Sequence, residues 1–194
     1  MAPESDEAKP TAAEQQNEES VASNEQKSEV DERREREDAM DPAELDKLLE
    51  TANSLKLEAN QRFGEGKFEE ALELYAKALD TAPLKFNQER AVILSNCAAA
   101  NIKLANWERA IQNATESIGL GVPNEKSLER RAFAYAKTDE NLEKAIEDYK
   151  KLQEQFPTRT QYARTLAELN QRLHERNERM KAEVMDQLKN LGNM

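Results

Sequence analysis

The sequence predicts an all-α fold in which helix–turn–helix units repeat along the chain as a solenoid. The first observation behind this prediction is periodicity, because Leu55, Ala59 and Phe63 recur every four residues, as on one face of a helix. The second is the break that follows, where Gly64 and Gly66 favour a tight turn. The third is that the unit over residues 55–83 recurs twice further along the chain. One such unit cannot bury its apolar face alone, so the copies are expected to stack.

The three copies share small residues at equivalent places and a proline at the end. The alanines of the second helices are 39 and 35 residues apart, at Ala71, Ala110 and Ala145. The first helices carry Ala59, Ala98 and Ala132. Proline cannot continue a helix, so each copy is expected to end at Pro83, Pro123 or Pro157. We therefore predict three repeats, over about residues 52–85, 91–123 and 125–157, in a domain spanning 41–157.

The charge of the chain is concentrated at its N-terminal end. The whole sequence has a net charge of −11, and residues 1–50 hold 17 Asp and Glu against 6 Lys and Arg. Residues 51–194 hold 22 of each and are neutral. Residues 1 to about 38 carry almost no large apolar side chain and cannot offset the entropy of ordering. The sequence therefore predicts a disordered acidic tail over 1–40, in which the mixed charges of 29–38 favour a transient helix.

A helix start follows the tail. Asp41 is placed to accept the N3 amide, Pro42 suits the first helical position, and Glu44 completes a capping-box pattern. An apolar stripe then runs without interruption into the first repeat. We expect the first repeat helix to extend back to about residue 42. A break into two helices near Asn53 is the alternative.

One long helical pattern follows the third repeat, over residues 158–194. Residues 160–174 suffice to cover the exposed apolar edge of that repeat, as a terminal cap must. The remainder carries apolar residues at helical spacing, namely Met180, Val184, Leu188 and Leu191. Two interpretations stay open for it: a solvated extension of the helix, or a contact surface for a partner or a second copy.

Composition argues against several classes of protein. No apolar run approaches membrane-spanning length, and no N-terminal apolar segment suggests secretion. We therefore expect a cytoplasmic protein without membrane insertion or nucleic-acid binding. Cys97 and His174 are the only residues of their kinds, so no disulfide, metal site, cofactor or catalytic machinery is expected, and the protein is predicted not to be an enzyme. Cys97 is predicted to be a small core residue.

The first helices of such a stack line its concave face, which is the usual binding surface. Helical spacing places one set of side chains from the three repeats on that face: Lys56, Asn60, Phe63, Asn96, Ala99, Ile102, Lys103, Lys126, Arg130 and Phe133. Cations and amide donors suit a carboxylate, and two carboxylates better than one. The alternative is a basic solvated face, since lysine and arginine are common on exposed helices.

The repeats resemble those of the tetratricopeptide-repeat family, whose period is about 34 residues. Within it, Lys56, Asn60, Asn96, Lys126 and Arg130 match the two-carboxylate clamp of co-chaperone domains. The resemblance implies that the first three bind the terminal main-chain carboxylate of a Glu-Glu-Val-Asp peptide. It implies that the last two bind side-chain and upstream backbone oxygens. A further cation and an apolar lining are implied for Ala99, Lys103 and Phe133, and Phe63 on the same face is a further candidate for peptide binding.

The same resemblance implies an adaptor that binds the C-terminal tails of heat-shock protein 90 and heat-shock protein 70. Members of the family are also described as binding G proteins. The alternative is therefore a scaffold that binds a folded signalling partner, such as a small or heterotrimeric G protein, through another face or the last helix. The two functions differ in whether binding requires a free C-terminal carboxylate.

Overall fold

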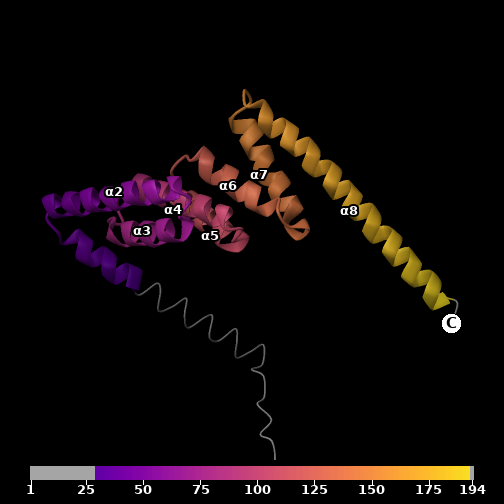
Figure 1. Ribbon diagram of the computed structural model, residues 1–194, viewed down its shortest axis with the longest axis horizontal. Coiled ribbons are helices and arrows are strands. Elements are labelled where there is room, and N and C mark those ends of the chain that lie inside the picture. Colours follow the sequence, from indigo (N-terminus) through magenta and orange to yellow (C-terminus); the bar gives the residue numbers. More distant parts are fainter. Residues whose placement is uncertain (1–28, 193–194) are drawn as a thin grey trace, which may run out of the picture. The chain divides into compact units, whose positions relative to one another are not determined.

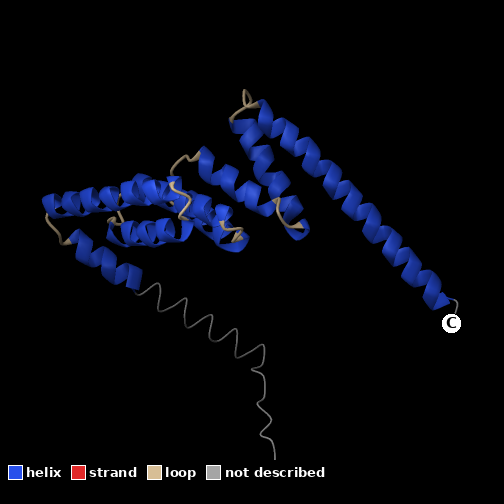
Figure 2. Ribbon diagram, viewed as in Figure 1, coloured by secondary structure: helices blue, strands red, loops and turns tan. Residues whose placement is uncertain are grey.

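The computed structural model describes residues 29–192, and its regular elements there are all helices, without a strand, as the sequence predicts (Figure 2). The described residues divide into two compact units, 29–46 and 47–192. The labelled elements are α2 (Pro42–Gly64), α3 (Phe68–Thr81), α4 (Asn87–Lys103), α5 (Trp107–Gly119), α6 (Glu125–Tyr135), the 3-10 helix η1 (Asp139–Asn141), α7 (Leu142–Gln155) and α8 (Thr160–Gly192).

The first unit contains a helix over residues 29–38. Arg33 Nε donates to Glu37 Oε1 at 2.7 Å, an ion pair four residues apart that stabilises a helix. At these residues, for which the sequence favours a transient helix within the tail, the structure has a helix, because opposite charges at helical spacing support regular structure. The rest of the expected disordered tail, residues 1–28, lies outside the described residues. Asp41 caps the following helix through the N2 amide of Ala43, at 2.8 Å, and not through the N3 amide.

The second unit is a stack of helical hairpins (Figure 1). From α3 to α8 each helix packs on the next, and α4 also packs on α6. α2 is continuous through Asn53, so the alternative of a break there is wrong. The second helix of each hairpin begins at a large apolar residue, Phe68, Trp107 or Leu142. Pairs of consecutive helices joined by short turns are the architecture that the repeat pattern predicts.

Alanine allows close approach of the helices. The six alanines that mark the repeats, at 59, 71, 98, 110, 132 and 145, are all fully buried. α4 is the most enclosed helix, with buried residues on most faces, including Ile93 and Cys97. The sequence predicts this central position for α4 from its largely apolar composition. Burial of Cys97 raises the pKa of its thiol to about 12, so the thiol is inert at neutral pH.

A buried pair of serine hydroxyls links α4, α5 and α6. Ser117 Oγ of α5 donates to the Ala91 carbonyl oxygen of α4 at 2.8 Å. It also lies 2.7 Å from Ser127 Oγ of α6, and both serines are fully buried. Because buried polar groups strongly favour partners, this arrangement holds α4 and α6 in one position relative to each other.

The turns inside the first two hairpins have the same backbone path. Gly66 and Ala105 occupy equivalent positions, 39 residues apart, and both have positive φ, at 79° and 56°. Each donates its amide to a carbonyl three residues earlier. A left-handed conformation is strained for alanine and unstrained for glycine. Ala105 therefore stores strain that Gly66 avoids.

We expect Ala105→Gly to raise the free energy of unfolding by about 0.5 kcal/mol, since the relieved strain exceeds the added freedom of the unfolded chain. The converse change, Gly66→Ala, should lower it by about 1 kcal/mol. A β-carbon at Gly66 would meet nothing within 4 Å, so only backbone strain is tested. Urea unfolding of both variants measures the effect. A stabilised Gly66→Ala variant would contradict the explanation.

The third hairpin replaces the left-handed turn by the short helix η1, where the sequence has one additional residue. Two arginines of α8 bind this turn. Arg172 donates to the Ala136 carbonyl oxygen and to Asp139 Oδ1, each at 2.9 Å. Arg176 binds the Asp139 carbonyl oxygen and the Glu143 carboxylate. The first half of α8 is thereby fixed on the last repeat, as a capping helix should be.

Candidate functional site

Two asparagines from different repeats meet on the first helices. Asn96 Nδ2 of α4 donates to Asn60 Oδ1 of α2 at 3.2 Å. The same oxygen accepts a hydrogen bond from the Tyr75 hydroxyl of α3 at 2.6 Å. Burial raises the pKa of Tyr75 to about 12, so the hydroxyl remains a neutral donor at physiological pH. Because both donors engage Oδ1, the Asn60 amide is oriented with its own N–H groups as the remaining donors.

Arg130 of α6 contacts the same region of α4. Its Nη1 donates to Ser95 Oγ at 2.6 Å, and Ser95 directly precedes Asn96. Burial lowers the pKa of the Arg130 guanidinium, although nearby Glu129 and Tyr75 oppose this shift. A partly desolvated guanidinium binds a carboxylate more strongly than an exposed one, because less solvation is lost and the local dielectric is lower.

A cavity of about 290 Å³ opens beside Arg130. Five of the nine predicted site residues line it, namely Phe63, Ala99, Lys103, Arg130 and Phe133. Ile102, Glu129 and Tyr149 complete the lining. The cavity therefore combines apolar walls from three repeats with two cations and one carboxylate. Such a lining suits an apolar side chain attached to an anionic group.

An aromatic cluster holds one wall of this cavity. The Phe133 ring lies 6.5 Å from the Trp107 ring, edge to face, and Lys137 Nζ lies 4.3 Å from the Phe133 centroid. Lys137 also lies 5.9 Å from the Trp107 centroid. Edge-to-face and cation–π contacts both favour a fixed ring position. Phe133 is thus positioned although part of its surface is exposed.

The two lysines of the predicted clamp, Lys56 and Lys126, have other surroundings than the asparagines and Arg130. Lys56 Nζ donates to Asn53 Oδ1 at 2.6 Å, one turn back on α2. Lys126 is exposed on α6, one turn before Arg130. Within the described residues, neither lysine contacts the asparagine pair or lines the cavity. The structure therefore brings together Asn60 with Asn96, and Arg130 with four residues of the lining.

Sequence reasoning missed three residues of this region, Tyr75, Ser95 and Tyr149. The tyrosines hold equivalent places in the first and third repeats, four residues after the central alanine. That equivalence suggests a shared structural position, but spacing alone does not show that their hydroxyl or ring reaches the first helices. Ser95 has no sequence signal beyond its place next to Asn96.

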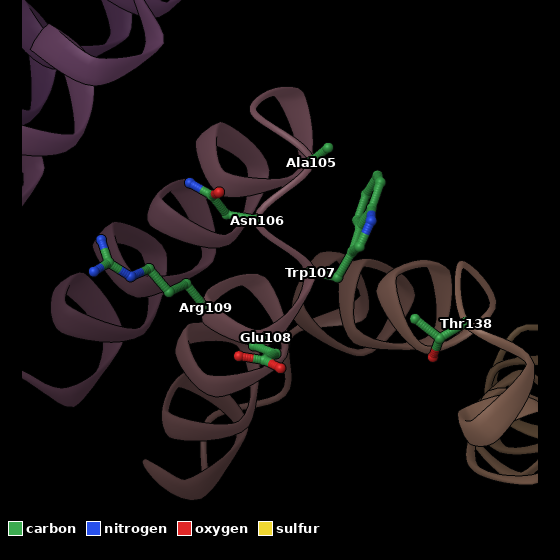
Figure 3. A pocket seen from close by; sticks show the side chains of 6 residues that line it. All are labelled: Ala105, Asn106, Trp107, Glu108, Arg109 and Thr138. Carbon is green, nitrogen blue, oxygen red and sulfur yellow. The ribbon is translucent and has the colours of Figure 1, made fainter.

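A second cavity, of about 330 Å³, lies at the turns of the later repeats. Ala105, Asn106, Trp107, Glu108, Arg109 and Thr138 line it. In Figure 3 the side chains of Asn106 and Arg109 extend away from Trp107 and Thr138. The polar groups do not converge on one point, as a ligand-binding site requires.

The described residues lack two further kinds of feature. They contain no group of three or more His, Cys, Asp or Glu side chains arranged to hold a metal ion. No helix among them is both long and apolar enough to cross a membrane.

Known proteins share part of this sequence. The chain is 33% identical over 100 residues to mitochondrial import receptor subunit TOM70 of Rattus norvegicus, covering 52% of this chain and 16% of that protein. It is 32% identical over 122 residues to sperm-associated antigen 1 of Mus musculus, covering 63% of this chain and 13% of that protein. The chain thus matches only about one sixth of the length of such relatives. No model of a protein family matches it.

Two similar solved structures share the fold over most of their own length. The first tetratricopeptide-repeat domain of Spaghetti (RPAP3), bound to the HSP90 peptide SRMEEVD, matches with a TM-score of 0.56 at 28% identity, over 63% of this chain and 95% of that chain. The second such domain of human RPAP3, in complex with the HSP70 peptide SGPTIEEVD, matches with 0.55 at 27%, over 61% and 94%. The chain is thus similar, in sequence and in fold, to tetratricopeptide-repeat domains.

Proposed function

We propose that this protein is an adaptor whose first helices bind the free C-terminal carboxylate of a chaperone tail ending in Glu-Glu-Val-Asp. The observation that carries the proposal is the convergence of donors from three repeats on α4. Asn60 meets Asn96 at 3.2 Å, and Arg130 meets the adjacent Ser95 at 2.6 Å. Oriented amide and guanidinium donors in a partly desolvated site are well suited to a carboxylate.

The cavity beside Arg130 supports a peptide and not a free anion. Its apolar lining from Phe63, Ala99 and Phe133 offers a place for a side chain upstream of the terminal residue. Lys56 and Lys126 then supply additional positive charge on the first helices. Long lysine side chains can reach an occupied site by rotating about their side-chain bonds.

The similar solved structures also support the proposal that the ligand is a chaperone peptide. The two RPAP3 domains named above are described with HSP90 and HSP70 peptides that end in Glu-Glu-Val-Asp. Heat-shock protein 90 and heat-shock protein 70 tails are therefore the proposed ligands, in the cytoplasm, and the proposed role is binding and not catalysis. The predicted division into repeats over about 52–85, 91–123 and 125–157 is part of the proposal.

The order of parts supports a finer resemblance. An acidic N-terminal region, an extended first helix, three repeats and a long final helix are also the parts of the adaptor tetratricopeptide repeat protein 1. The alternative function, a scaffold for a G protein, rests on that resemblance alone. The contacts of the candidate site do not bear on it.

The experiment that tests the proposal is a titration of the full chain with the peptide SRMEEVD, free at its C-terminus or amidated. We expect micromolar binding of the free peptide, about −8 kcal/mol, because a short peptide buries little surface. Amidation removes the terminal charge and should weaken binding at least about tenfold, since charge-assisted hydrogen bonds are lost. Isothermal calorimetry measures both.

Equal affinity for the free and the amidated peptide would contradict a carboxylate site. A scrambled peptide that keeps the terminal Asp is the control, because it separates carboxylate capture from recognition of the upstream residues.

A further inference from the structure

The last part of α8 carries an apolar stripe that the repeats do not cover. In the part of the chain that the structure describes, nine large apolar side chains are exposed, and five of them lie between residues 180 and 191. Met180, Val184, Leu188 and Leu191 follow one another at intervals of four, four and three residues and are 53–70% exposed. This spacing places all four on one face of the helix. We call them the α8 stripe.

The α8 stripe continues an interface that already exists within the molecule. Tyr162 and Leu169 are buried, and Leu173 packs against the same cluster of the third repeat. Met180 follows Leu173 by seven residues, two turns further along the same face. Arg176 pairs with Glu143 and Arg179 with Asp139, and these are the ion pairs between α8 and the third repeat that lie closest to the stripe. The contacts of the third repeat with α8 therefore end where the stripe begins. Figure 1 shows the C-terminal half of α8 extending beyond α7. The face of α8 that packs on α7 is therefore uncovered in the part of α8 that extends beyond α7.

The charges beside the stripe indicate what could cover it. Glu183 lies on one flank of the stripe and Lys181 on the other, whereas Arg179, Asp186 and Lys189 lie on the far face of the helix, where Lys189 Nζ is 3.8 Å from Asp186 Oδ1. Charges of both signs thus lie around the stripe, as on helices that pair with other helices. A membrane surface or a nucleic acid would instead select one sign, predominantly positive. The partner of the stripe is therefore an apolar helix with mixed charges beside it.

We propose that the partner is the α8 stripe of a second copy of this chain, paired antiparallel. The stripe is nearly symmetric on reversal, since its intervals read four, four, three in one direction and three, four, four in the other. An antiparallel pair therefore places Met180 opposite Leu191 of the second copy and Val184 opposite Leu188. Such a two-fold contact is self-complementary and closed, as in most homodimers.

Two physical arguments favour the antiparallel over the parallel arrangement. Antiparallel helices place the positive end of one dipole beside the negative end of the other. They also carry the two repeat domains to opposite ends of the pair, because each domain is attached at the N-terminal half of its own α8. A parallel pair would bring both domains to the same end.

Sedimentation of the full chain tests the proposal. We expect a dimer to appear as the concentration rises through the micromolar range, because four side chains per copy form a small interface. The double variant Val184→Ser/Leu188→Ser should raise the dissociation constant at least about tenfold. Met185→Ser is the matched control, since Met185 is 56% exposed on the same helix but lies about 100° around from Val184. It should leave the constant within about twofold.

Cross-linking tests the orientation without relying on the stability of the serine variant. Met180→Cys and Leu191→Cys chains are mixed and oxidised, and the mixed disulfide should form faster than either homodimeric one. Cys97 does not interfere, because it is buried and its thiol remains protonated at neutral pH. A chain that stays monomeric at about 1 mM, or a dimer that the serine changes leave intact, overturns the proposal. Preferential Met180→Cys homodimers overturn the antiparallel arrangement.

Discussion

Arg130→Ala is expected to weaken binding of a chaperone-type C-terminal peptide by about ten- to a hundredfold. A charge-assisted hydrogen bond contributes about 1.5–3 kcal/mol, which corresponds to that range. Arg130 is expected at the upper end, because it is partly desolvated and lines the cavity directly. Lys126→Ala should cost about tenfold, since an exposed ammonium is screened by water. Calorimetry with SRMEEVD measures both losses.

Two controls separate binding from folding in this experiment. Arg130→Lys keeps the charge and removes the planar fork, so it should recover only part of the affinity. Arg164→Ala removes an 84%-exposed arginine from α8 and should leave the affinity unchanged. Thermal unfolding of each variant shows whether loss of the Ser95 contact alone disturbs the repeats. Wild-type affinity of the Arg130→Ala and Lys126→Ala variants, with intact folding, would contradict the proposed site.

Much of the fold could be predicted from local sequence signals. Glycine at a left-handed turn and proline after a helix act through their own backbone, so they mark Gly66, Pro83 and Pro157 without tertiary information. Ala105 shows the limit of this approach. It adopts the same left-handed turn, although alanine does not favour it, because the surrounding hairpin imposes the path. Only its equivalence to Gly66 in the repeat indicates the conformation.

The sequence predicts which residues form the candidate site better than it predicts which partners their side chains contact. Helical spacing shows which face a side chain occupies, and five of the predicted residues line one cavity. Spacing does not show which partners the side chains choose. Arg130 binds Ser95, Lys56 binds Asn53, and Tyr75 orients Asn60. These pairs depend on distances between helices of different hairpins, or on rotamers, and neither is encoded in a repeat pattern.

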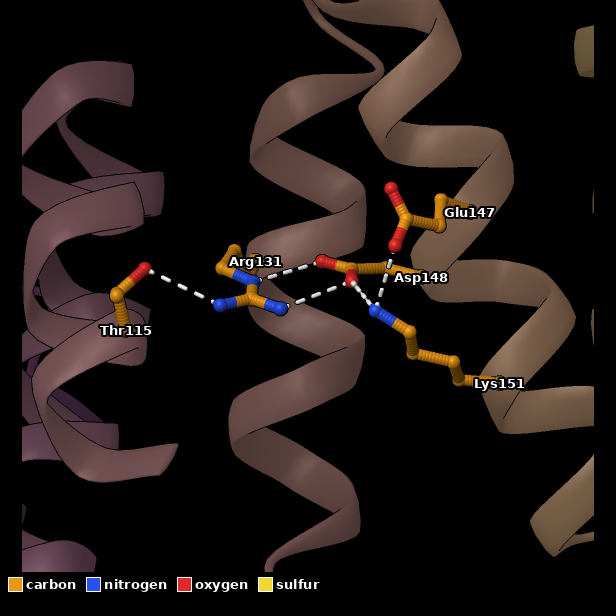
Figure 4. A network of polar contacts seen from close by, with 5 residues as sticks. All are labelled: Thr115, Arg131, Glu147, Asp148 and Lys151. Carbon is orange, nitrogen blue, oxygen red and sulfur yellow. Dashed lines mark hydrogen bonds and ion pairs between the residues drawn. The ribbon is translucent and has the colours of Figure 1, made fainter. Parts of the chain in front are cut away.

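Asp148→Ala is expected to lower the free energy of unfolding of the repeats by about 3–5 kcal/mol. Arg131 of α6 and Asp148 of α7 form a bidentate pair, Nε to Oδ2 at 2.7 Å and Nη2 to Oδ1 at 2.9 Å (Figure 4). Asp148 is 3% exposed, and its hydrogen bond raises the pKa of Arg131. Removing the carboxylate leaves the guanidinium without its main acceptor, apart from a longer contact of 3.4 Å to Thr115 Oγ1. A midpoint about 10 °C lower in a thermal scan would correspond to this loss.

The cause of that loss is an unpaired cation and not the absence of a favourable pair, and two variants distinguish these explanations. Arg131→Met/Asp148→Leu removes both charges and keeps the volume, so it should restore most of the stability lost in Asp148→Ala. Lys151→Ala removes a lysine whose 2.9 Å pair with Glu147 is exposed and whose Nζ lies 3.8 Å from Asp148 Oδ1, so the midpoint should fall far less than in Asp148→Ala. Because α6 also carries Arg130, the double variant should bind peptide like the original chain if its helices keep their places. A double variant as unstable as Asp148→Ala would show that the ion pair itself stabilises the fold.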